Sequence, residues 1–280
     1  MVSRLKATKR PMRKLLQDQG NLHSKVANLR GLLDELQCEI DKDPTNSALL
    51  DKEAACLKDF QIAQLDEERF LKQKSKVEWL GVGDSNSAYF HNCVKSRNHR
   101  SRIEVIRDVN GTLHEGSAAP KAIVDHYANF LGREGHTTCT PTLDIFTRKL
   151  SSQKAESMVH NVTNDEIRKA MFSIGENKAP GPDGFSSAFF KGAWDVVGPD
   201  ICLAIHEFFR NGKLLQQVNH TLLALVPKVA TPACVTDYRP ISCCNTLFKC
   251  ISKILTERMK DGLLDLISIN QSAFVPGRRF

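Results

Sequence analysis

The sequence predicts an α+β protein in which helices predominate. Two observations favour helix: apolar residues recur every three or four positions across residues 22–40, and residues 163–174 join a helix-start signature to one apolar face. A third observation favours strands, because apolar and polar residues alternate on both sides of Asn110-Gly111. The chain is therefore expected to comprise a helical arm, a small βα unit and a mixed C-terminal region.

Composition sets the limits for this prediction. The chain has 280 residues, 41% of them hydrophobic and 25% charged, which suits one large or two modest globular domains. The formal net charge of +7 favours anionic partners such as RNA or DNA. Nine cysteines without C-x-x-C spacing argue against a zinc ribbon and for free thiols in a reducing compartment. No stretch has the apolar length of a signal peptide or membrane span, so we expect a soluble, intracellular protein that is nuclear or cytoplasmic.

The first predicted region is a helical arm over residues 1–80. Six apolar residues occupy the a and d positions of a helix: Leu22, Val26, Leu29, Leu33, Leu36 and Ile40. Asp43-Pro44 ends that helix, and a second helical stretch over 48–79 follows, so the pair is expected to form an antiparallel hairpin. Two alternatives remain for the arm, a structural element or a coiled coil through which the protein self-associates.

The basic start of the chain, MVSRLKATKRPMRK, carries six lysines or arginines and no acidic residue. It could contact phosphate, but we expect a solvated, frayed terminus here.

The second predicted region is a basic connector over residues 81–150. Its main signal is a set of four cations without an acidic neighbour, just after Tyr89, Phe90 and His91: Lys95, Arg97, Arg100 and Arg102. Cations neutralise phosphates and aromatic rings stack on bases, so the stretch indicates either a nucleic-acid contact or a solvated turn. After it, Asn110-Gly111 predicts a tight hairpin turn, and a helix is expected over 117–131.

The third predicted region covers residues 151–280. TNDE at 163–166 predicts a capping box in which Glu166 reaches back to the backbone of the cap. The apolar face of this helix is expected to consist of Ile167, Ala170, Met171 and Ile174. The following GENKAPGPDGF holds two prolines and two glycines that fix its backbone, which leaves Lys178 and Asp183 on a rigid loop.

Further along, the pattern predicts helices over 187–194 and 200–210, the latter ended by Asn211-Gly212. TLLALVPK is expected to form a buried strand that reaches Lys228, and DYRPIS a returning segment with Arg239. A last helix is expected over 245–260, with a buried side formed by Leu247, Phe248, Ile251, Ile254, Leu255 and Met259.

The third region resembles a known family. NKAPGPDGF, FFKGAW, NHTLLALVPK, DYRPIS, FKCISKILTERM and QSAFVPGR closely resemble, in order, the N-terminal half of the reverse transcriptase of plant LINE-type, non-LTR retrotransposons. The resemblance covers about residues 160–280, and GDSNSAYFH and the hairpin of the connector also look like the family's segment before its polymerase domain. It implies a partial right-hand polymerase, namely the fingers region of an RNA-directed DNA polymerase.

The resemblance also implies roles for individual residues. The KAPGPDG loop with Lys178 would lie against the template, Lys228 and Arg239 would face the triphosphate of the incoming nucleotide, and Arg278 would lie near the same fingertips. A lysine and an arginine on one hairpin suit a polyphosphate, since one is a compact charge and the other a planar fork.

The metal-binding aspartates of such a polymerase are not found in this sequence. No two aspartates are adjacent, and Tyr89, Tyr127 and Tyr238 do not lead into a tyrosine-x-aspartate-aspartate turn. We therefore expect a reverse transcriptase that stops before its catalytic palm, with no catalytic or metal-binding residue and no cofactor, although magnesium is implied for a complete family member. Its expected activity is weak, sequence-independent binding of RNA or DNA. The alternatives are a host interaction module that acts through the helical arm, or part of a longer, active enzyme.

Overall fold

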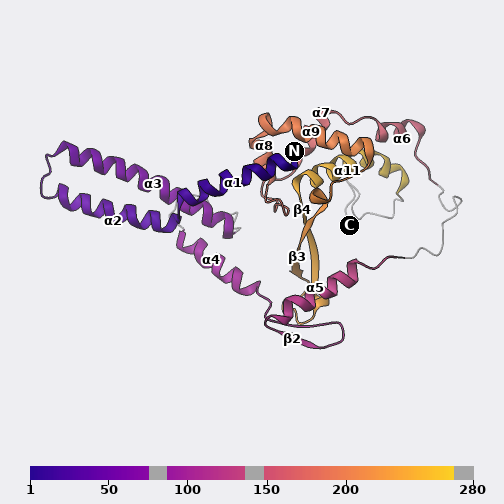
Figure 1. Ribbon diagram of the computed structural model, residues 1–280, viewed down its shortest axis with the longest axis horizontal. Coiled ribbons are helices and arrows are strands. Elements are labelled where there is room, and N and C mark those ends of the chain that lie inside the picture. The colour runs from indigo at the N-terminus through magenta and orange to yellow at the C-terminus, as the bar shows by residue number, and fades with distance from the viewer. Residues whose placement is uncertain (76–86, 136–147, 268–280) are drawn as a thin grey trace. The chain divides into compact units, whose positions relative to one another are not determined.

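The structure is a computed structural model that describes residues 1–75, 87–135 and 148–267. The chain divides into two compact units, one formed by residues 3–104 and the other by residues 105–280 with the first two residues. Helices predominate in both units (Figure 1). We call the unit of residues 3–104 the arm.

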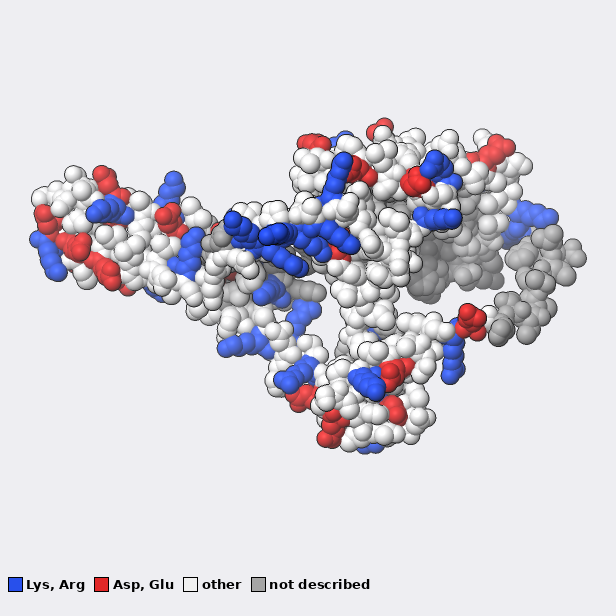
Figure 2. Space-filling view, in the orientation of Figure 1, with Lys and Arg blue, Asp and Glu red and all other residues white. Residues whose placement is uncertain are grey.

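The arm begins with helix α1 (Val2–Gln19). The expected frayed terminus is therefore wrong, because this segment is helical throughout and contains Pro11 in its interior. Most of its residues are alanine, leucine, methionine, glutamine, lysine or arginine, which lose little side-chain freedom in a helix. Lysine and arginine side chains gather along α1 in the space-filling view (Figure 2).

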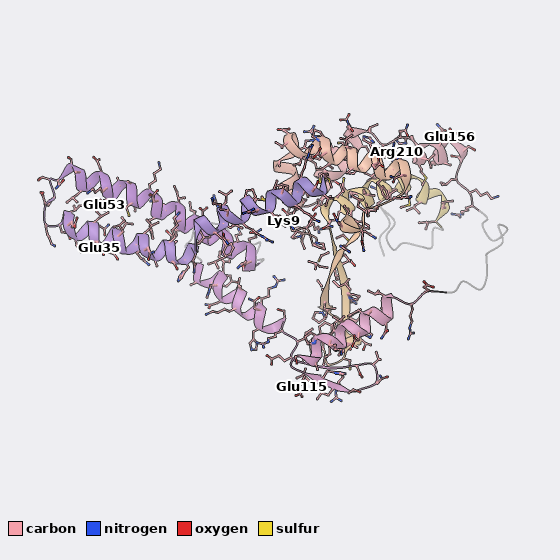
Figure 3. All side chains as sticks on the ribbon, viewed as in Figure 1. Lys9, Glu35, Glu53, Glu115, Glu156 and Arg210 are labelled. Carbon is pink, nitrogen blue, oxygen red and sulfur yellow. The ribbon has the colours of Figure 1, made fainter. Side chains whose placement is uncertain are left out.

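The next two helices, α2 (Leu22–Ile40) and α3 (Ser47–Ser75), form the predicted antiparallel hairpin. Leu33, Leu36 and Cys56 are buried between them, and partly buried apolar residues pack around these three. The Gln37 amide donates to the Glu53 carboxylate at 3.1 Å, and Glu53 is labelled on α3 in Figure 3. Leu33 and Leu36 of the predicted a and d positions thus pack against α3 of the same chain. Helix α4 (Ser87–Arg100) contacts α3 and completes the arm.

The other unit starts with strands β1 (Val105–Arg107) and β2 (Leu113–Glu115) and helix α5 (Ala118–Leu131). The strands pair antiparallel, so the predicted hairpin and the helix after it are confirmed. The turn is wider than predicted, because Arg107 pairs with Leu113 and five residues lie between them. The Asp108 carboxylate closes this loop by accepting from the backbone N–H groups of Asn110 and Thr112 at 2.8 and 2.9 Å. Its hydrogen bond with His114 is the main cause of the lowered pKa of Asp108.

Most of the remaining elements form a helical bundle with one two-stranded ribbon. They are α6 (Ser152–Val159), α7 (Asn164–Ser173), α8 (Ser187–Gly192), α9 (Trp194–Asn211), α10 (Gln216–Asn219), β3 (Thr221–Pro227), β4 (Tyr238–Cys244) and α11 (Thr246–Leu266). The largest buried side chains belong to α7, α8, α9 and α11: Ile167, Met171, Phe190, Ile201, Ile205 and Ile254. This bundle core results from amphipathic helices that bury one face each.

Several boundaries in the bundle differ from the sequence prediction. Helix α9 begins at Trp194 and continues through Pro199, although proline cannot donate to the carbonyl four residues earlier. It ends as predicted at Gly212, whose φ of 69° is left-handed. Helix α11 extends to Leu266, and Leu255 and Met259 are 40% and 45% exposed rather than buried.

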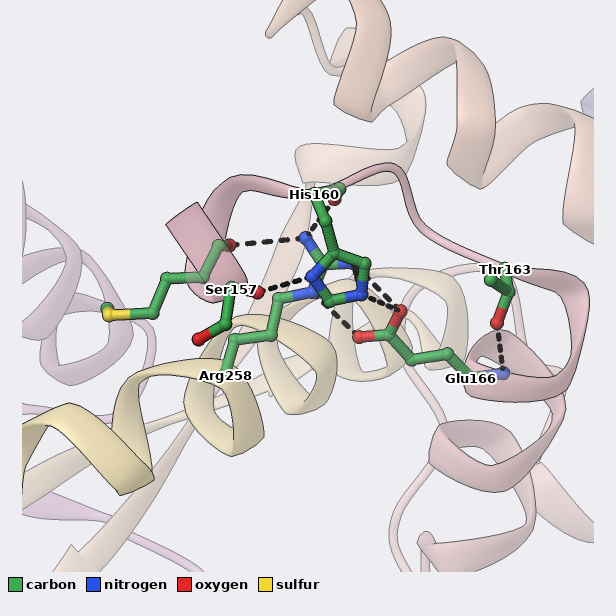
Figure 4. A network of polar contacts seen from close by, with 6 residues as sticks. Ser157, His160, Thr163, Glu166 and Arg258 are labelled. Atoms are coloured by element: carbon green, nitrogen blue, oxygen red, sulfur yellow. Dashed lines mark hydrogen bonds and ion pairs between the residues drawn. The ribbon is translucent and has the colours of Figure 1, made fainter. Parts of the chain in front are cut away.

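Arg258 of α11 joins three helices through one polar network (Figure 4). Its guanidinium donates to both oxygens of Glu166 at 2.7 and 2.8 Å, and to the carbonyls of Met158 and His160 at 3.2 and 2.7 Å. The Arg258 side chain is 8% exposed. Half of the predicted capping box is therefore wrong. Thr163 accepts from the Glu166 backbone N–H at 3.2 Å, but the Glu166 carboxylate binds Arg258 instead of the cap, because a charged fork offers stronger hydrogen bonds.

None of the described helices is long and apolar enough to cross a membrane. The eight cysteines in the described residues are free thiols. Burial raises the pKa of the Cys250 thiol to about 12, so this core residue is unreactive.

Candidate nucleic-acid and nucleotide interface

The glycine- and proline-rich loop over residues 175–185 is fixed against the start of α11. The Asn245 side chain accepts from the Asp183 backbone N–H at 3.2 Å and donates to the carbonyls of Gln217 and Val218 at 3.1 and 3.0 Å. Thr246 donates to the Phe185 carbonyl at 3.0 Å, in a buried position. Asn245 itself is 2% exposed. One buried amide thus links the loop, α10 and the end of β4.

Gly181 explains why this loop needs glycine. A Cβ atom at this position would lie 2.3 Å from Asn245 Oδ1 and 2.4 Å from the Asn245 backbone nitrogen. Such a contact is too close for any side chain, so only glycine allows the loop to approach α11. Lys249 closes the other side of the loop, since its ammonium donates to the Ala179 carbonyl at 2.5 Å. The rigid loop that the sequence predicts is present, and its Lys178 is exposed.

The ribbon of β3 and β4 carries the two predicted nucleotide-binding residues. Val226 pairs with Arg239 and Pro227 with Tyr238, and the Lys228 backbone N–H donates to the Asp237 carbonyl at 2.7 Å. Val226 and Arg239 are directly opposite and therefore share one face. Lys228 follows β3 two positions after Val226, so continued alternation would place it diagonally beside Arg239. Arg239 is exposed, and the Lys228 ammonium donates to the Thr236 carbonyl at 2.7 Å. An ammonium has three donors, so this bond leaves two for a ligand.

The end of the ribbon near Lys228 is held by β1 and α5, which belong to the predicted connector. The backbone N–H of Arg107 donates to the Ala233 carbonyl at 2.9 Å, and the Tyr127 hydroxyl donates to the Tyr238 carbonyl at 3.2 Å in a buried position. Asp237 accepts from the backbone N–H groups of Cys234 and Ala233 at 2.8 and 3.0 Å, which lowers its pKa. These contacts fix the turn that follows Lys228.

The predicted buried strand is wrong in one respect. Between its fixed ends the ribbon is open, with Leu222, Leu223, Val226 and Ile241 exposed by 42–56%. The pairing itself supplies partners for the backbone, so the two strands form although these apolar side chains are exposed.

The structure does not bring all predicted site residues together. Lys178 lies on the loop at the Asn245 end of the ribbon, whereas Arg239 is five residues from Cys244, about 17 Å along the strand. Arg278 falls outside the described residues. The described interface therefore consists of two separate parts, the loop and the face with Lys228 and Arg239.

The basic stretch of the connector has a different geometry from the one the sequence suggested. Lys95 and Arg97 are both exposed, but two residues on a helix are separated by about 200°, so they point to nearly opposite sides of α4. Arg102 has an acidic neighbour after all, because its Nε lies 3.2 Å from the Glu104 carboxylate. Phe90 is fully buried and cannot stack on a base. The side chain of Arg100 lies outside the described residues.

No carboxylate cluster for a metal ion occurs within the described ranges, where no three histidine, cysteine, aspartate or glutamate side chains are placed to share one. Within these ranges the structure thus offers no group of three such side chains for the magnesium ions that the resemblance implies for a complete polymerase.

Sequence reasoning missed two residues that position this interface. Asn245 precedes an apolar helix, which is the signature of an N-cap, yet its side chain makes no cap hydrogen bond and binds other segments instead. Tyr127 lies in the helix expected over 117–131, and nothing near it in the sequence points to the Tyr238 carbonyl.

Comparison with known proteins gives one informative similarity. The chain is 29% identical over 211 residues, or 73% of its length, to the Transposon TX1 uncharacterized 149 kDa protein of Xenopus laevis. It spans 16% of the length of that relative. No family model matches the chain. The similarity supports the origin of this protein in a transposable element.

Proposed function

We propose that this chain is the part of a non-LTR retrotransposon reverse transcriptase that holds the template and the incoming nucleotide. The observation that carries the proposal is the ribbon face with Lys228 and Arg239, fixed at one end through Asn245 and at the other through Tyr127. Two cations on a fixed frame suit a triphosphate, because little freedom is lost when the ligand binds. The similarity to a transposon protein supports the same assignment.

In this proposal the two parts of the interface have different tasks. The loop over residues 175–185 presents Lys178 to the backbone of a template strand, while the guanidinium of Arg239 grips phosphate oxygens as a fork and Lys228 adds a point charge. Both contacts are to phosphate, so the binding of RNA or DNA does not depend on base sequence.

We expect nucleoside triphosphate to bind at Lys228 and Arg239 with a Kd no tighter than roughly millimolar, about 4 kcal/mol. The described residues provide no carboxylate cluster for a metal ion, so we expect the two cations alone to supply the affinity. Titration of ¹⁵N-labelled protein followed by NMR should show shifts concentrated between residues 226 and 239. The shifts should disappear in Arg239→Ala and persist in the matched surface variant Arg210→Ala. Shifts confined to the arm in a folded sample would contradict the proposal.

We also expect the 280-residue chain by itself not to extend a primer on an RNA template with magnesium and deoxynucleotides. In-line phosphoryl transfer by polymerases uses two metal ions held by aspartates, and the sequence has no adjacent pair of aspartates. The measurement is primer extension against a mock preparation. Template-dependent extension above that background would show that other carboxylates of the chain supply the metal site.

A further inference from the structure

The cations of α1 lie on one side of the helix. Four of them, Lys6, Arg10, Arg13 and Lys14, are exposed and separated by four, three and one residues. At about 100° per residue these positions fall within an arc of about 100°. We call this set the α1 stripe, and Figure 2 shows the run of basic side chains along the helix.

The α1 stripe is not neutralised by the protein. None of its four side chains takes part in an ion pair within residues 1–75, 87–135 and 148–267. The helix has no acidic residue before its last two positions. Like charges three or four residues apart repel each other on a helix, so a polyanion laid along the stripe would relieve that repulsion.

The apolar side of α1 is buried at one residue and exposed at others. Leu5 is 9% exposed and is therefore already buried in the protein. Leu16 lines a hollow of the arm together with His23 and Phe70, but this residue is 67% exposed, and Met12 and Leu15 are exposed as well. A helix that lies on a membrane inserts its whole apolar face between lipids, and here that face is partly used. The stripe itself consists of cations alone, which suits a run of phosphates.

We propose that the α1 stripe binds the sugar-phosphate backbone of RNA or DNA at a site separate from the β3–β4 ribbon. From Lys6 to Lys14 the helix rises about 12 Å, which matches three to four phosphates along one strand of a duplex, roughly 3.4 Å apart. The four charges therefore suit a continuous run of phosphates. Binding is independent of base sequence, because no side chain of the stripe reads a base edge.

The test is a salt titration with the full chain and a fluorescein-labelled single-stranded RNA of mixed sequence. Replacing Lys6, Arg10, Arg13 and Lys14 together by glutamine should lower the slope of log affinity against log salt by about 2.8, at 0.7 for each phosphate contact. At about 100 mM salt the affinity should fall at least tenfold. Glutamine favours helix, and circular dichroism verifies that α1 persists.

The matched control removes the same number of exposed charges from α2 and α3, by changing Lys25, Arg30, Lys52 and Lys58 to glutamine. The control should leave the slope nearly unchanged, and an equal loss in both variants would overturn the proposal. So would an unchanged slope in the stripe variant. A duplex DNA of the same length shows whether the stripe favours one strand or two.

Two further measurements separate the possible partners and sites. Sedimentation with vesicles of phosphatidylcholine and phosphatidylserine should show no loss specific to the stripe variant. Vesicle binding that needs the four cations, with RNA affinity unaffected, would replace a nucleic-acid site by a membrane site. Arg239→Ala should not alter the part of the salt slope that the stripe supplies, so failure of the ribbon site and failure of the α1 stripe are distinguishable.

Discussion

Replacing Arg258 by alanine should lower the free energy of unfolding by about 3–5 kcal/mol. The change removes every bond of the guanidinium to Glu166 and to the carbonyls of Met158 and His160. It leaves the Glu166 carboxylate, 25% exposed, without its cation. Urea unfolding followed by tryptophan fluorescence measures the loss. A loss below about 1 kcal/mol would mean that water replaces the guanidinium without strain.

Arg210→Ala is the matched control for this prediction. Arg210 binds Glu207 at 2.6 Å, but both side chains are more than half exposed, and pairs of this kind contribute about 0–1 kcal/mol (Figure 3). The two variants remove the same chemical group from one unit. Their difference therefore isolates the effect of burial.

The stability of the protein at acid pH should also depend on the ion pair between Arg258 and Glu166. Arg258 is the main cause of the lowered pKa of Glu166, whose ordinary value is 4.5. A carboxylate with a lowered pKa in the folded state stabilises the protein above its ordinary pKa, and that contribution disappears as the pH falls through the folded value. The wild-type protein should therefore lose more stability than Arg258→Ala between about pH 5 and pH 3.

Replacing Asn245 by alanine should lower the free energy of unfolding by about 2–4 kcal/mol. Three backbone groups lose their partner, but only the Val218 carbonyl is fully buried and costs about 1–3 kcal/mol, while water can reach the other two in part. Hydrogen exchange should accelerate most at Asp183, whose backbone N–H loses its acceptor. In Asn245→Asp the acceptor for that N–H remains while the donors to Gln217 and Val218 are lost. The aspartate variant should therefore protect the Asp183 amide better than the alanine variant does.

Asn211→Ala serves as the control for Asn245, because the Asn211 amide binds only exposed groups, Glu207 and the Lys213 backbone. We expect a change within about 0.5 kcal/mol. If Asn245→Ala were as mild as this control, other contacts, among them those of Thr246, Lys249 and Ser187, would be sufficient to hold the loop over residues 175–185.

Local sequence signals predicted most of the elements but few of their long-range partners. The spacing of Leu33 and Leu36, the alternation around Asn110-Gly111 and the cap at Thr163 are properties of neighbouring residues, and the structure contains all three features. Glu166 was assigned to its own cap because that partner is three residues away, whereas Arg258 is 92 residues away. A pattern of one segment cannot reveal such a partner.

The candidate site shows the same limit in another form. Four cations between Lys95 and Arg102 looked like one patch because they are close in sequence, but a helix separates Lys95 from Arg97 by about 200°. The basic residues of the α1 stripe are also evident in the sequence. Only the helix of the structure reveals that four of them lie on one side. The role of Asn245 could not be predicted from the sequence, because its three hydrogen bonds join it to residues 27, 28 and 62 positions away.

The bond between Tyr127 and the Tyr238 carbonyl has a consequence for the order of folding. The two residues are 111 positions apart, so the ribbon reaches its supported state only after a long loop has closed, a step that slows folding. During synthesis the connector leaves the ribosome first, and β3 and β4 then pair with each other across the ten residues 228–237. The connector is thus synthesised before the ribbon that it supports. A recombinant fragment that begins after residue 135 would contain the ribbon but not Tyr127, which supports it.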